Sequence, residues 1–366
     1  MTGLKVGLFV LLLCVFMAGA GRPRGGGPRP GGPPGGAPGA PMPGPPQRPP
    51  QPPPPPPPQI QWARSEDGLT WAAEPGVVFD HASSPGALLR KNGTFLVYFT
   101  SVPGNLLSVA VSTDGGQTWQ VQAVELNGSL AKAPVDPDPV ELPTGSIRLF
   151  YCDAKDVEPP APRPDQAPPV YGAAPADTDH KPKPHPIYSA ISRDGVRFNE
   201  EPGPRVSQPG IRRPDVIRSE HWWRMYLSVD SDVLSAYSQD GMTWMMDKGE
   251  RAYFGAHTST VRLADGRWRM YFSGNGIESM ISKDGMNWDY EDGVRLEALP
   301  RHALSNPSVV RLPDGSYLMF FESAMVPPAP EIQVPGQPGQ ARTPAGPGPG
   351  GPPPGEGPGN PPPPPK

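Results

Sequence analysis

The amino-acid sequence predicts an all-β protein: a five-bladed β-propeller with two-plus-two strand closure, flanked by disordered Pro/Gly-rich tails. Three observations support this prediction: a motif that recurs five times, a hairpin pattern that alternates with it, and an uneven distribution of proline and glycine. The chain has 366 residues, of which 60 are proline and 44 are glycine. These two residue types crowd into 21–59, 154–186 and 326–366, which is typical of low-complexity segments. The remaining sequence has the composition of one folded domain.

The recurring motif is Ser-x-Asp-Gly-x-x-(Trp/Phe), here named the Asp motif. Its five aspartates are Asp67, Asp114, Asp194, Asp240 and Asp284, and the second copy carries one extra glycine. Neighbouring copies lie 44 to 47 residues apart, except for an 80-residue interval that contains the Pro-rich insertion 154–186. A fixed period of this length indicates a repeat architecture. We expect each Asp carboxylate to accept backbone amide hydrogen bonds within a turn, and the glycine to supply its unusual backbone angle.

A second pattern alternates with the Asp motif and consists of an apolar run, a tight turn and an aromatic run. Its five copies span 88–98, 140–150, 216–226, 261–271 and 310–320. Three of the turns contain Asn92-Gly93, Asp265-Gly266 or Asp314-Gly315. Such pairs favour hairpins because both turn positions tolerate positive φ. One hairpin of this kind and one that turns at an Asp motif make four strands, which is one propeller blade.

The two ends of the repeat region are incomplete in complementary ways. Residues 60–71 supply a third strand and an Asp motif without a first hairpin, whereas residues 305–323 supply a first hairpin without an Asp motif. Together they complete one blade, which closes the ring and removes its free edges. The sequence therefore predicts one propeller domain over 60–325, interrupted by the insertion 154–186.

The N-terminal residues 1–20 have the features of a secretory signal peptide. Lys5 precedes an apolar stretch over 6–17, and Ala18-Gly19-Ala20 fits a cleavage site. We therefore expect an exported protein without a membrane span after cleavage, located in the periplasm, at the cell surface or in the medium. An uncleaved membrane anchor is the alternative interpretation.

The Pro/Gly-rich ranges 21–59 and 326–366 are predicted to be disordered, because neither residue type supports a packed core. They are interpreted as linkers or as docking segments for a cell wall or a protein. The net charge of -4 and the absence of a basic stripe exclude nucleic acid as an expected partner. Cys152 is the only cysteine left after signal cleavage and lies in a strand-like run, so a buried free thiol is predicted.

Candidate functional residues follow from where the innermost strands of a propeller begin, since ligands bind there near the axis. Alignment of the first hairpins places one residue of each blade at this point: Ser84, Asp136, Arg212, His257 and Asn306. Asp138, Arg213 and Asp215 are close in sequence. The loops between second and third strands open on the same face and add Asp153, Asp230, Asp232, Asn275, Glu278 and Glu322.

The Asp motifs are similar to the Asp boxes of bacterial neuraminidase-repeat proteins. The alternation of hairpins over about 60–323 resembles the five-bladed propeller glycoside hydrolases, which include arabinanases, β-xylosidases and invertases. The resemblance implies carbohydrate as the ligand and a structural role for the five Asp-motif aspartates on the outer rim. No cofactor or metal is expected, and His257 is interpreted as a core histidine; the alternative that the resemblance implies is a Ca²⁺ ion near His257 at the axis. Arabinanase-like enzymes carry an Asp in the first blade and a Glu in the third. This chain has Ser84-Pro85 and Arg213-Pro214-Asp215 at those places.

Two functions are compatible with this pattern. The first is a sialidase-like or arabinanase-like hydrolase that cleaves a glycosidic bond with a pair of carboxyl groups. The catalytic candidates are Asp138, Asp215 and Glu322, and the substrate-binding candidates are Asp136, Arg212, Arg213, His257, Asn306 and Glu278. The second is a carbohydrate- or protein-binding propeller without catalysis, in which Asp136 and Asp138 shape an entry turn and the arginines pair with them. The insertion 154–186 is expected to shield or extend the pocket.

Overall fold

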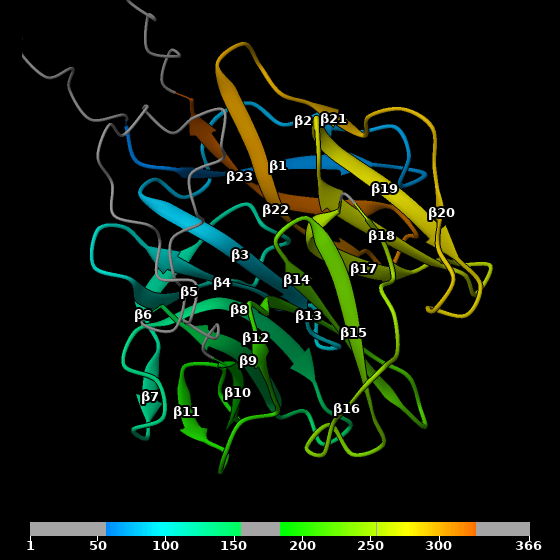
Figure 1. Ribbon diagram of the computed structural model, residues 1–366. Helices are drawn as coiled ribbons and strands as arrows, with labels where there is room; N and C mark the ends of the chain where they lie inside the picture. Colours follow the sequence, from blue (N-terminus) through cyan, green and yellow to red (C-terminus); the bar gives the residue numbers. More distant parts are fainter. Residues whose placement is uncertain (1–55, 155–183, 254, 327–366) are drawn as a thin grey trace, which may run out of the picture. The chain divides into compact units, whose positions relative to one another are not determined.

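The computed structural model describes residues 56–154, 184–253 and 255–326, and every regular element in these ranges is a β-strand (Figure 1). Within these ranges no helix is long and apolar enough to cross a membrane. The predicted signal peptide 1–20, most of the linker 21–59, the insertion residues 155–183 and the tail 327–366 lie outside the described residues. Predictions about those segments remain predictions.

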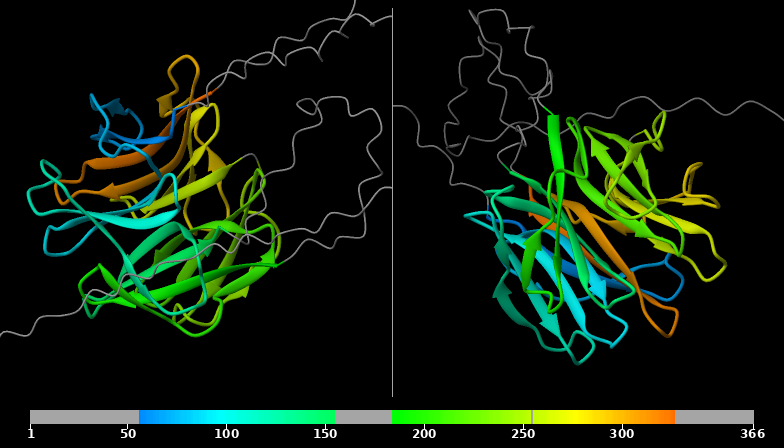
Figure 2. Two further views of the ribbon diagram at one scale, coloured as in Figure 1. Left: turned by 90° about the vertical axis from the view of Figure 1, so that its left-hand side faces the viewer. Right: turned by 90° about the horizontal axis from the view of Figure 1, so that it is seen from below.

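The strands form five sheets around one axis, antiparallel except for one short pair, and each sheet is a blade (Figures 1 and 2). Blade I contains β3 (Ala82–Leu89), β4 (Phe95–Ser101), β5 (Leu106–Ser112) and β6 (Gln120–Ala123). Blade III contains β13 (Arg212–Arg218), β14 (Trp223–Val229), β15 (Asp232–Ser238) and β16 (Met245–Met246). Blade IV contains β17 (Ala256–Arg262), β18 (Trp268–Ser273), β19 (Gly276–Ser282) and β20 (Asp289–Tyr290), with β21 (Leu296–Glu297) beside β19.

Blade II is the widest sheet because two short strands extend its four-stranded core. The core strands are β8 (Pro134–Glu141), β9 (Ile147–Asp153), β10 (Pro184–Ser192) and β11 (Arg197–Glu200). The additional strands are β7 (Glu125–Asn127), which runs parallel to β11, and β12 (Val206–Pro209), which pairs with β10. The predicted insertion thus falls between the second and third strands of this blade, as expected.

Blade V joins the two ends of the ring. It consists of β22 (His302–Arg311), β23 (Tyr317–Met325), β1 (Gln59–Ser65) and β2 (Ala72–Ala73). Strand β1 pairs antiparallel with β23, with Ile60 opposite Glu322 and Ser65 opposite Tyr317. The predicted two-plus-two closure is therefore confirmed.

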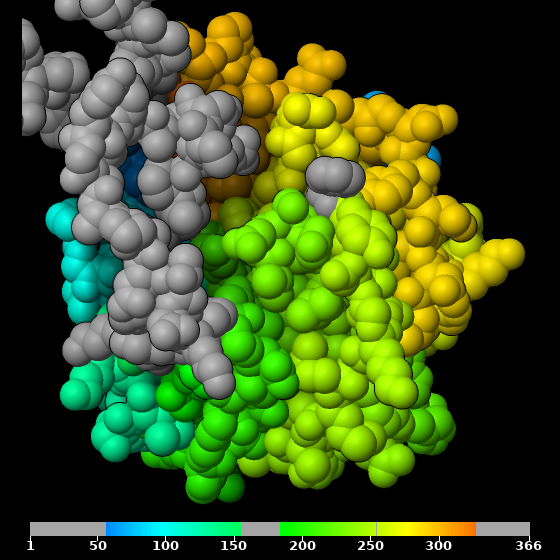
Figure 3. Space-filling view, in the orientation of Figure 1, coloured from blue at the N-terminus to red at the C-terminus, as the bar shows by residue number. Residues whose placement is uncertain are grey.

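The hydrophobic core lies between blades, because each of its five clusters takes side chains from two neighbouring blades. The pairs, in ring order, include Tyr98 with Leu149, Phe150 with Met225, Tyr226 with Met270, Tyr271 with Phe321, and Phe320 with Phe95. In the space-filling view the yellow-green residues of blade III lie directly against the yellow residues of blade IV (Figure 3). No blade has a core of its own, so the ring is stable only as a whole.

The Asp motifs form the turns that the sequence predicts. The amides of Leu69 and Thr70 both donate to Asp67 Oδ1 at 2.7 Å, and Gly68 adopts a φ of 72°. The backbone bond from Thr70 is the largest cause of the lowered pKa of Asp67. Equivalent amide bonds are present at the other four aspartates.

These turns also anchor neighbouring blades at four of the five interfaces. Tyr271 of blade IV donates its hydroxyl to the carbonyl of Gly68 at 2.7 Å, and Arg269 donates to the carbonyl of Asp67 at 3.1 Å. A two-pronged ion pair with Glu291, at 2.7 and 2.9 Å, holds the Arg269 guanidinium in place. Equivalent tyrosine bonds join blades I to II and III to IV, and equivalent arginine bonds join II to III and III to IV.

Deletion of residues 60–73 should abolish cooperative unfolding. The deletion removes β1 and β2, leaves the edge of β23 unpaired, and takes away the carbonyl groups that Arg269 and Tyr271 contact. Urea titration followed by circular dichroism measures the effect. Deletion of 40–53, a segment of equal length before the first strand, is the control and should leave the transition unchanged. A sharp, unshifted transition after deletion of 60–73 would contradict the closure described here.

Candidate functional site

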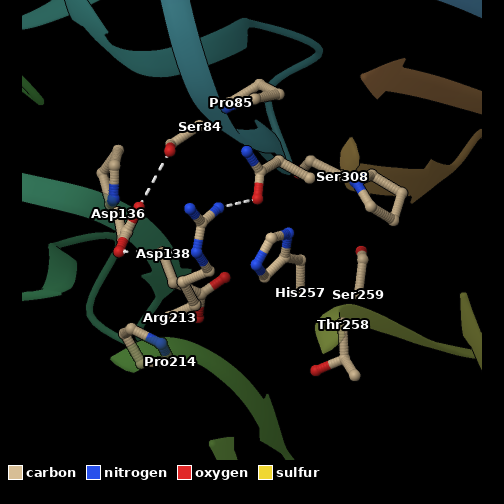
Figure 4. A pocket seen from close by; sticks show the side chains of 13 residues that line it. Ser84, Pro85, Asp136, Asp138, Arg213, Pro214, His257, Thr258, Ser259 and Ser308 are labelled. Atoms are coloured by element: carbon tan, nitrogen blue, oxygen red, sulfur yellow. Dashed lines mark hydrogen bonds and ion pairs between the residues drawn. The ribbon is translucent and has the colours of Figure 1, made fainter. Parts of the chain in front are cut away.

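The five innermost strands begin with the same local irregularity. In each strand a bulge interrupts the pairing with the second strand. The residue within the bulge has a left-handed backbone, with φ between 51° and 57°, at Ser84, Asp136, Arg213, His257 and Asn306. A non-glycine residue in this region costs about 1 kcal/mol or more, and such strain clusters at functional sites. The bulge turns these side chains toward the axis (Figure 4).

Blade III differs by one residue from the sequence alignment. The structure places Arg213 at the position equivalent to Ser84 and Asp136, whereas the alignment placed Arg212 there. Arg212 lies one position earlier and approaches Asp230, with an Nη2–Oδ1 distance of 3.9 Å. The shift arose because Val216 and Ile217 are both aliphatic, so either one aligns with the apolar positions of the other blades.

The inward side chains surround a small axial cavity of about 40 Å³. Its lining includes the predicted residues Asp136, Asp138, Arg213, His257 and Asn306. The Arg213 guanidinium occupies the middle of the site, between Asp136 and His257 (Figure 4). A volume of this size accommodates only a few water molecules. The cavity is therefore much smaller than a typical ligand pocket of about 300 Å³ or more.

Hydrogen bonds and one ion pair connect four of the blades in a closed circuit around this cavity. Ser84 Oγ donates to Asp136 Oδ1 at 2.8 Å, and the Arg213 guanidinium lies 3.9 Å from Asp136. Arg213 also donates to the side-chain oxygen of Asn306. The Asn306 amide then donates to Glu322 Oε2 at 2.7 Å, and the backbone amide of Ser84 donates to the same oxygen at 3.1 Å. Each charged group in the circuit thus has a partner within it.

His257 comes from blade IV, the one blade that does not take part in this circuit. Its backbone amide donates to Ser228 Oγ at 2.8 Å, and its Nδ1 lies 3.4 Å from Ser273 Oγ. Burial, followed by the positive charges of Arg213 and Arg212, lowers the pKa of His257 well below its ordinary value. The imidazole is therefore neutral at pH 7.

The residues near His257 do not fit the Ca²⁺ ion that the resemblance implied. Calcium requires six to eight oxygen ligands, many of them from carboxylates. The nearest charges on His257 are two arginines, which repel a cation. Among the described residues no group of three or more His, Cys, Asp and Glu side chains is arranged to hold a metal.

Asp138 and Asp215 connect neighbouring innermost strands. Asp138 Oδ2 accepts the amide of Val216 in the next blade at 2.9 Å. Asp215 accepts the amide and the hydroxyl of Thr260 in the blade after that, at 3.1 and 2.7 Å. Burial, followed by the charge of Asp215, raises the pKa of Asp138 well above its ordinary value. Burial also raises the pKa of Asp215, which the hydrogen bonds from Thr260 partly offset.

The remaining candidates lie around the cavity without lining it. Glu322 joins the circuit through hydrogen bonds, Asp215 is buried and 5% exposed, and Glu278 accepts the amide of Asn275 at 2.9 Å. Cys152 is buried, as predicted, and burial raises the pKa of its thiol.

Several lining residues were not predicted from the sequence, namely Pro85, Pro137, Pro214, Pro307, Thr258, Ser259 and Ser308. The sequence did indicate the prolines, because four of the five bulge residues with a left-handed backbone are followed directly by a proline. Proline at this position lacks an amide donor and therefore suits a bulge, where no ladder hydrogen bond is needed.

Comparison with solved structures places this fold beside carbohydrate-active proteins. A thermostable family-43 glycoside hydrolase is similar with a TM-score of 0.50 and 12% identity, over 67% of this chain and 88% of that chain. A protein of unknown function from Dyadobacter fermentans has a TM-score of 0.48 and 16% identity, over 74% and 84% of the two chains. An α-L-arabinanase from Penicillium chrysogenum, complexed with arabinobiose, has a TM-score of 0.43 and 12% identity, over 67% and 93%. No protein-family model and no curated protein sequence matches the chain.

The substitution Asp138→Asn should stabilise the protein at pH 7. The folded state holds a proton on Asp138 that the unfolded chain releases above about pH 4, so stability falls as pH rises through the raised pKa. Asparagine keeps an acceptor for the Val216 amide and carries no charge. Urea unfolding between about pH 4 and pH 8 should show that the free energy of unfolding of the variant exceeds that of the unmodified protein, by a difference that grows with pH.

The matched comparison is Asp240→Asn, at an aspartate whose pKa is lowered to about 2 by hydrogen bonds from the Thr243 and Met242 amides. Its contribution to stability is present above about pH 4 and is lost as pH falls toward 2. Asp240→Asn should therefore destabilise the protein at pH 7. Two variants that shift stability in the same direction at pH 7 would contradict these assignments.

Proposed function

We propose that this propeller binds carbohydrate at its axial site without hydrolysing it, and that the chain is exported. The observation that carries the proposal is the placement of the carboxyl groups. The two carboxyl groups that line the cavity, those of Asp136 and Asp138, both come from β8, and Arg213 stands between them and the opposite blades.

Hydrolysis of a glycosidic bond requires two carboxyl groups on opposite sides of that bond, about 5 to 10 Å apart. Asp136 and Asp138 lie two positions apart on β8, so both carboxyl groups reach the cavity from the same blade rather than from opposite sides. Asp215 accepts two hydrogen bonds from Thr260, and Glu322 accepts bonds from Ser84 and Asn306. The carboxylates beyond β8 are therefore engaged in holding the ring together.

The ligand class follows from the side chains that converge on the axis. The cavity presents hydroxyl, guanidinium, imidazole, amide and carboxylate groups from all five blades. Such a set of donors and acceptors suits the hydroxyl groups of a sugar, and polar groups of this kind fix a ligand's orientation. The likeness of the fold to a family-43 glycoside hydrolase supports the same class. A carbohydrate on this face would contact the mouth of the cavity, because an interior of about 40 Å³ is too small for a sugar ring.

A second candidate function is hydrolysis, which one observation favours. Asp138 lines the cavity and has a raised pKa, which is the property of a general acid in glycosidases. In that case Asp138 would protonate the leaving group, with Asp215 and Glu322 as the other catalytic candidates. The two functions make opposite predictions for turnover.

The full-length protein should bind neutral oligosaccharides on a glycan array and should not cleave arylglycosides, including arabinosides, xylosides, galactosides and sialosides. Arg213→Gln should weaken that binding at least about tenfold, because charged hydrogen bonds contribute about 1.5 to 3 kcal/mol. Arg212→Gln is the matched control, since Arg212 does not line the cavity, and it should bind as the unmodified protein does.

Turnover that disappears in both Asp138→Asn and Asp215→Asn, with unchanged folding, would replace the binding proposal with hydrolysis. Equal binding by the Arg213 and Arg212 variants would show that the carbohydrate does not bind at the axial site. A glycan array without any bound ligand would count against carbohydrate as the ligand class.

A further inference from the structure

The axis of the propeller has a second end, at which the innermost strands finish. The hairpin turns that follow β3, β17 and β22 surround a shallow depression there, with a volume of about 570 Å³. Blades IV, V and I, which are consecutive in the ring, contribute its lining. Four of the lining side chains are cations, Arg90, Lys91, Arg262 and Arg311, and none is acidic. We refer to this site as the basic depression.

Three of these cations have no carboxylate partner in the part of the chain that the structure describes. Lys91, Arg262 and Arg311 are exposed and form no ion pair there. Arg90 differs, because its guanidinium pairs with Glu141 at 3.1 Å and donates to the carbonyl of Gly145 at 2.7 Å. Glu141 also accepts the backbone amide of Lys91 at 3.1 Å, so one carboxylate faces four cations and the basic depression has an excess of positive charge.

Part of this charge is held in position before any ligand arrives. The Arg262 guanidinium lies 5.5 Å from the centre of the Trp268 ring, and that ring is only 7% exposed. Stacking on an aromatic face fixes the plane of a guanidinium and leaves its N–H edge free to bind an oxyanion in a two-pronged manner. Fewer rotamers are then lost on binding, which favours affinity.

The lining between the cations is apolar and includes Val261, Leu312 and Pro313. A matching ligand must therefore carry repeated anionic groups and also present apolar faces between them. A chain of uronic acid residues has both features, since each sugar ring exposes a C–H face and bears one carboxylate. No aromatic side chain lines the depression, so it lacks the platforms on which nucleic-acid bases stack.

We propose that the basic depression binds a carboxylated polysaccharide of the polyuronate type. The inference goes beyond the proposed function, because the axial site lies at the start of the innermost strands and the basic depression at their end. Lys91, Arg262 and Arg311 attract the carboxylates, and Leu312 and Pro313 contact the sugar rings. The attraction is electrostatic and solvent-exposed, so it weakens as salt concentration rises.

The test uses oligogalacturonate as the probe and the full-length protein, with binding followed by calorimetry at low salt. The double variant Arg262→Ala/Arg311→Ala should bind at least about tenfold more weakly, because two charge-assisted contacts are lost. The same oligosaccharide with its carboxylates methyl-esterified should not bind. Both substituted side chains are exposed, so the double variant should still unfold cooperatively, with a melting temperature lowered by at most a few degrees through loss of the Arg262–Trp268 contact.

The matched control is Arg193→Ala/Lys283→Ala, which removes two exposed cations beside the Asp motifs of blades II and IV. It should bind oligogalacturonate as the unmodified protein does. An equal loss in this control, or equal binding of the esterified probe, would overturn the proposal. Tighter binding of polyglutamate than of oligogalacturonate would also overturn it in favour of an acidic peptide. If only Arg213→Gln weakened oligogalacturonate binding, the ligand would bind at the axial site and not at the basic depression. If neutral glycans failed to bind, only the function proposed above would be contradicted.

Discussion

At four of its five blade interfaces, the ring depends on a hydrogen bond that crosses from one innermost strand to the next. Neighbouring innermost strands belong to different sheets, so their backbone amides cannot pair in a ladder, and side chains of one blade accept them instead. The donor–acceptor pairs are Val216 to Asp138, Thr260 to Asp215, Val309 to Ser259, and Ala87 to Ser308. At the interface between blades I and II this bond is missing, because Gly86 has no side chain that could accept a hydrogen bond and Pro139 has no backbone N–H that could donate one. An added Cβ at Gly86 would lie 2.0 Å from the Pro137 carbonyl, so the missing bond is replaced by close backbone contact.

This constraint explains why strongly perturbed carboxyl groups gather near the axis. A buried amide needs an acceptor, and at two interfaces the acceptor is an aspartate that burial drives toward its neutral form. Perturbed pKa values are often taken as a sign of catalysis, but burial of an aspartate that links two blades produces the same upward shift, which the hydrogen bond itself partly offsets. Both carboxyl oxygens of Asp215 accept a hydrogen bond from Thr260 of the next blade. For Asp138 one oxygen accepts the Val216 amide, and the residue also lines the cavity.

The sequence was sufficient for the architecture because the Asp motif and the hairpin turns act locally and repeat with a fixed period. It predicted blade number, strand order and closure, and it brought Asp136, His257 and Asn306 to the axis. It placed Arg212 where Arg213 lies, because two adjacent aliphatic residues left the register of β13 undetermined by one position. It could not predict that the Arg213 guanidinium occupies the middle of the site, since this depends on side-chain torsions and on contacts with Asp136 and Asn306 from two other blades.

The two ends of the axis differ in how their charges are compensated. At the start of the innermost strands Arg213 lies between Asp136 and Asn306, and Glu322 accepts two hydrogen bonds, so the charges are paired within the ring. At the other end of these strands, Arg262 and Arg311 line the basic depression and form no ion pair among the described residues. Paired charges confer specificity for neutral polar ligands at short range, whereas unpaired charges attract anions over about a Debye length. The innermost strands therefore present paired charges at one end of the axis and, in blades IV, V and I, cations without an ion pair at the other.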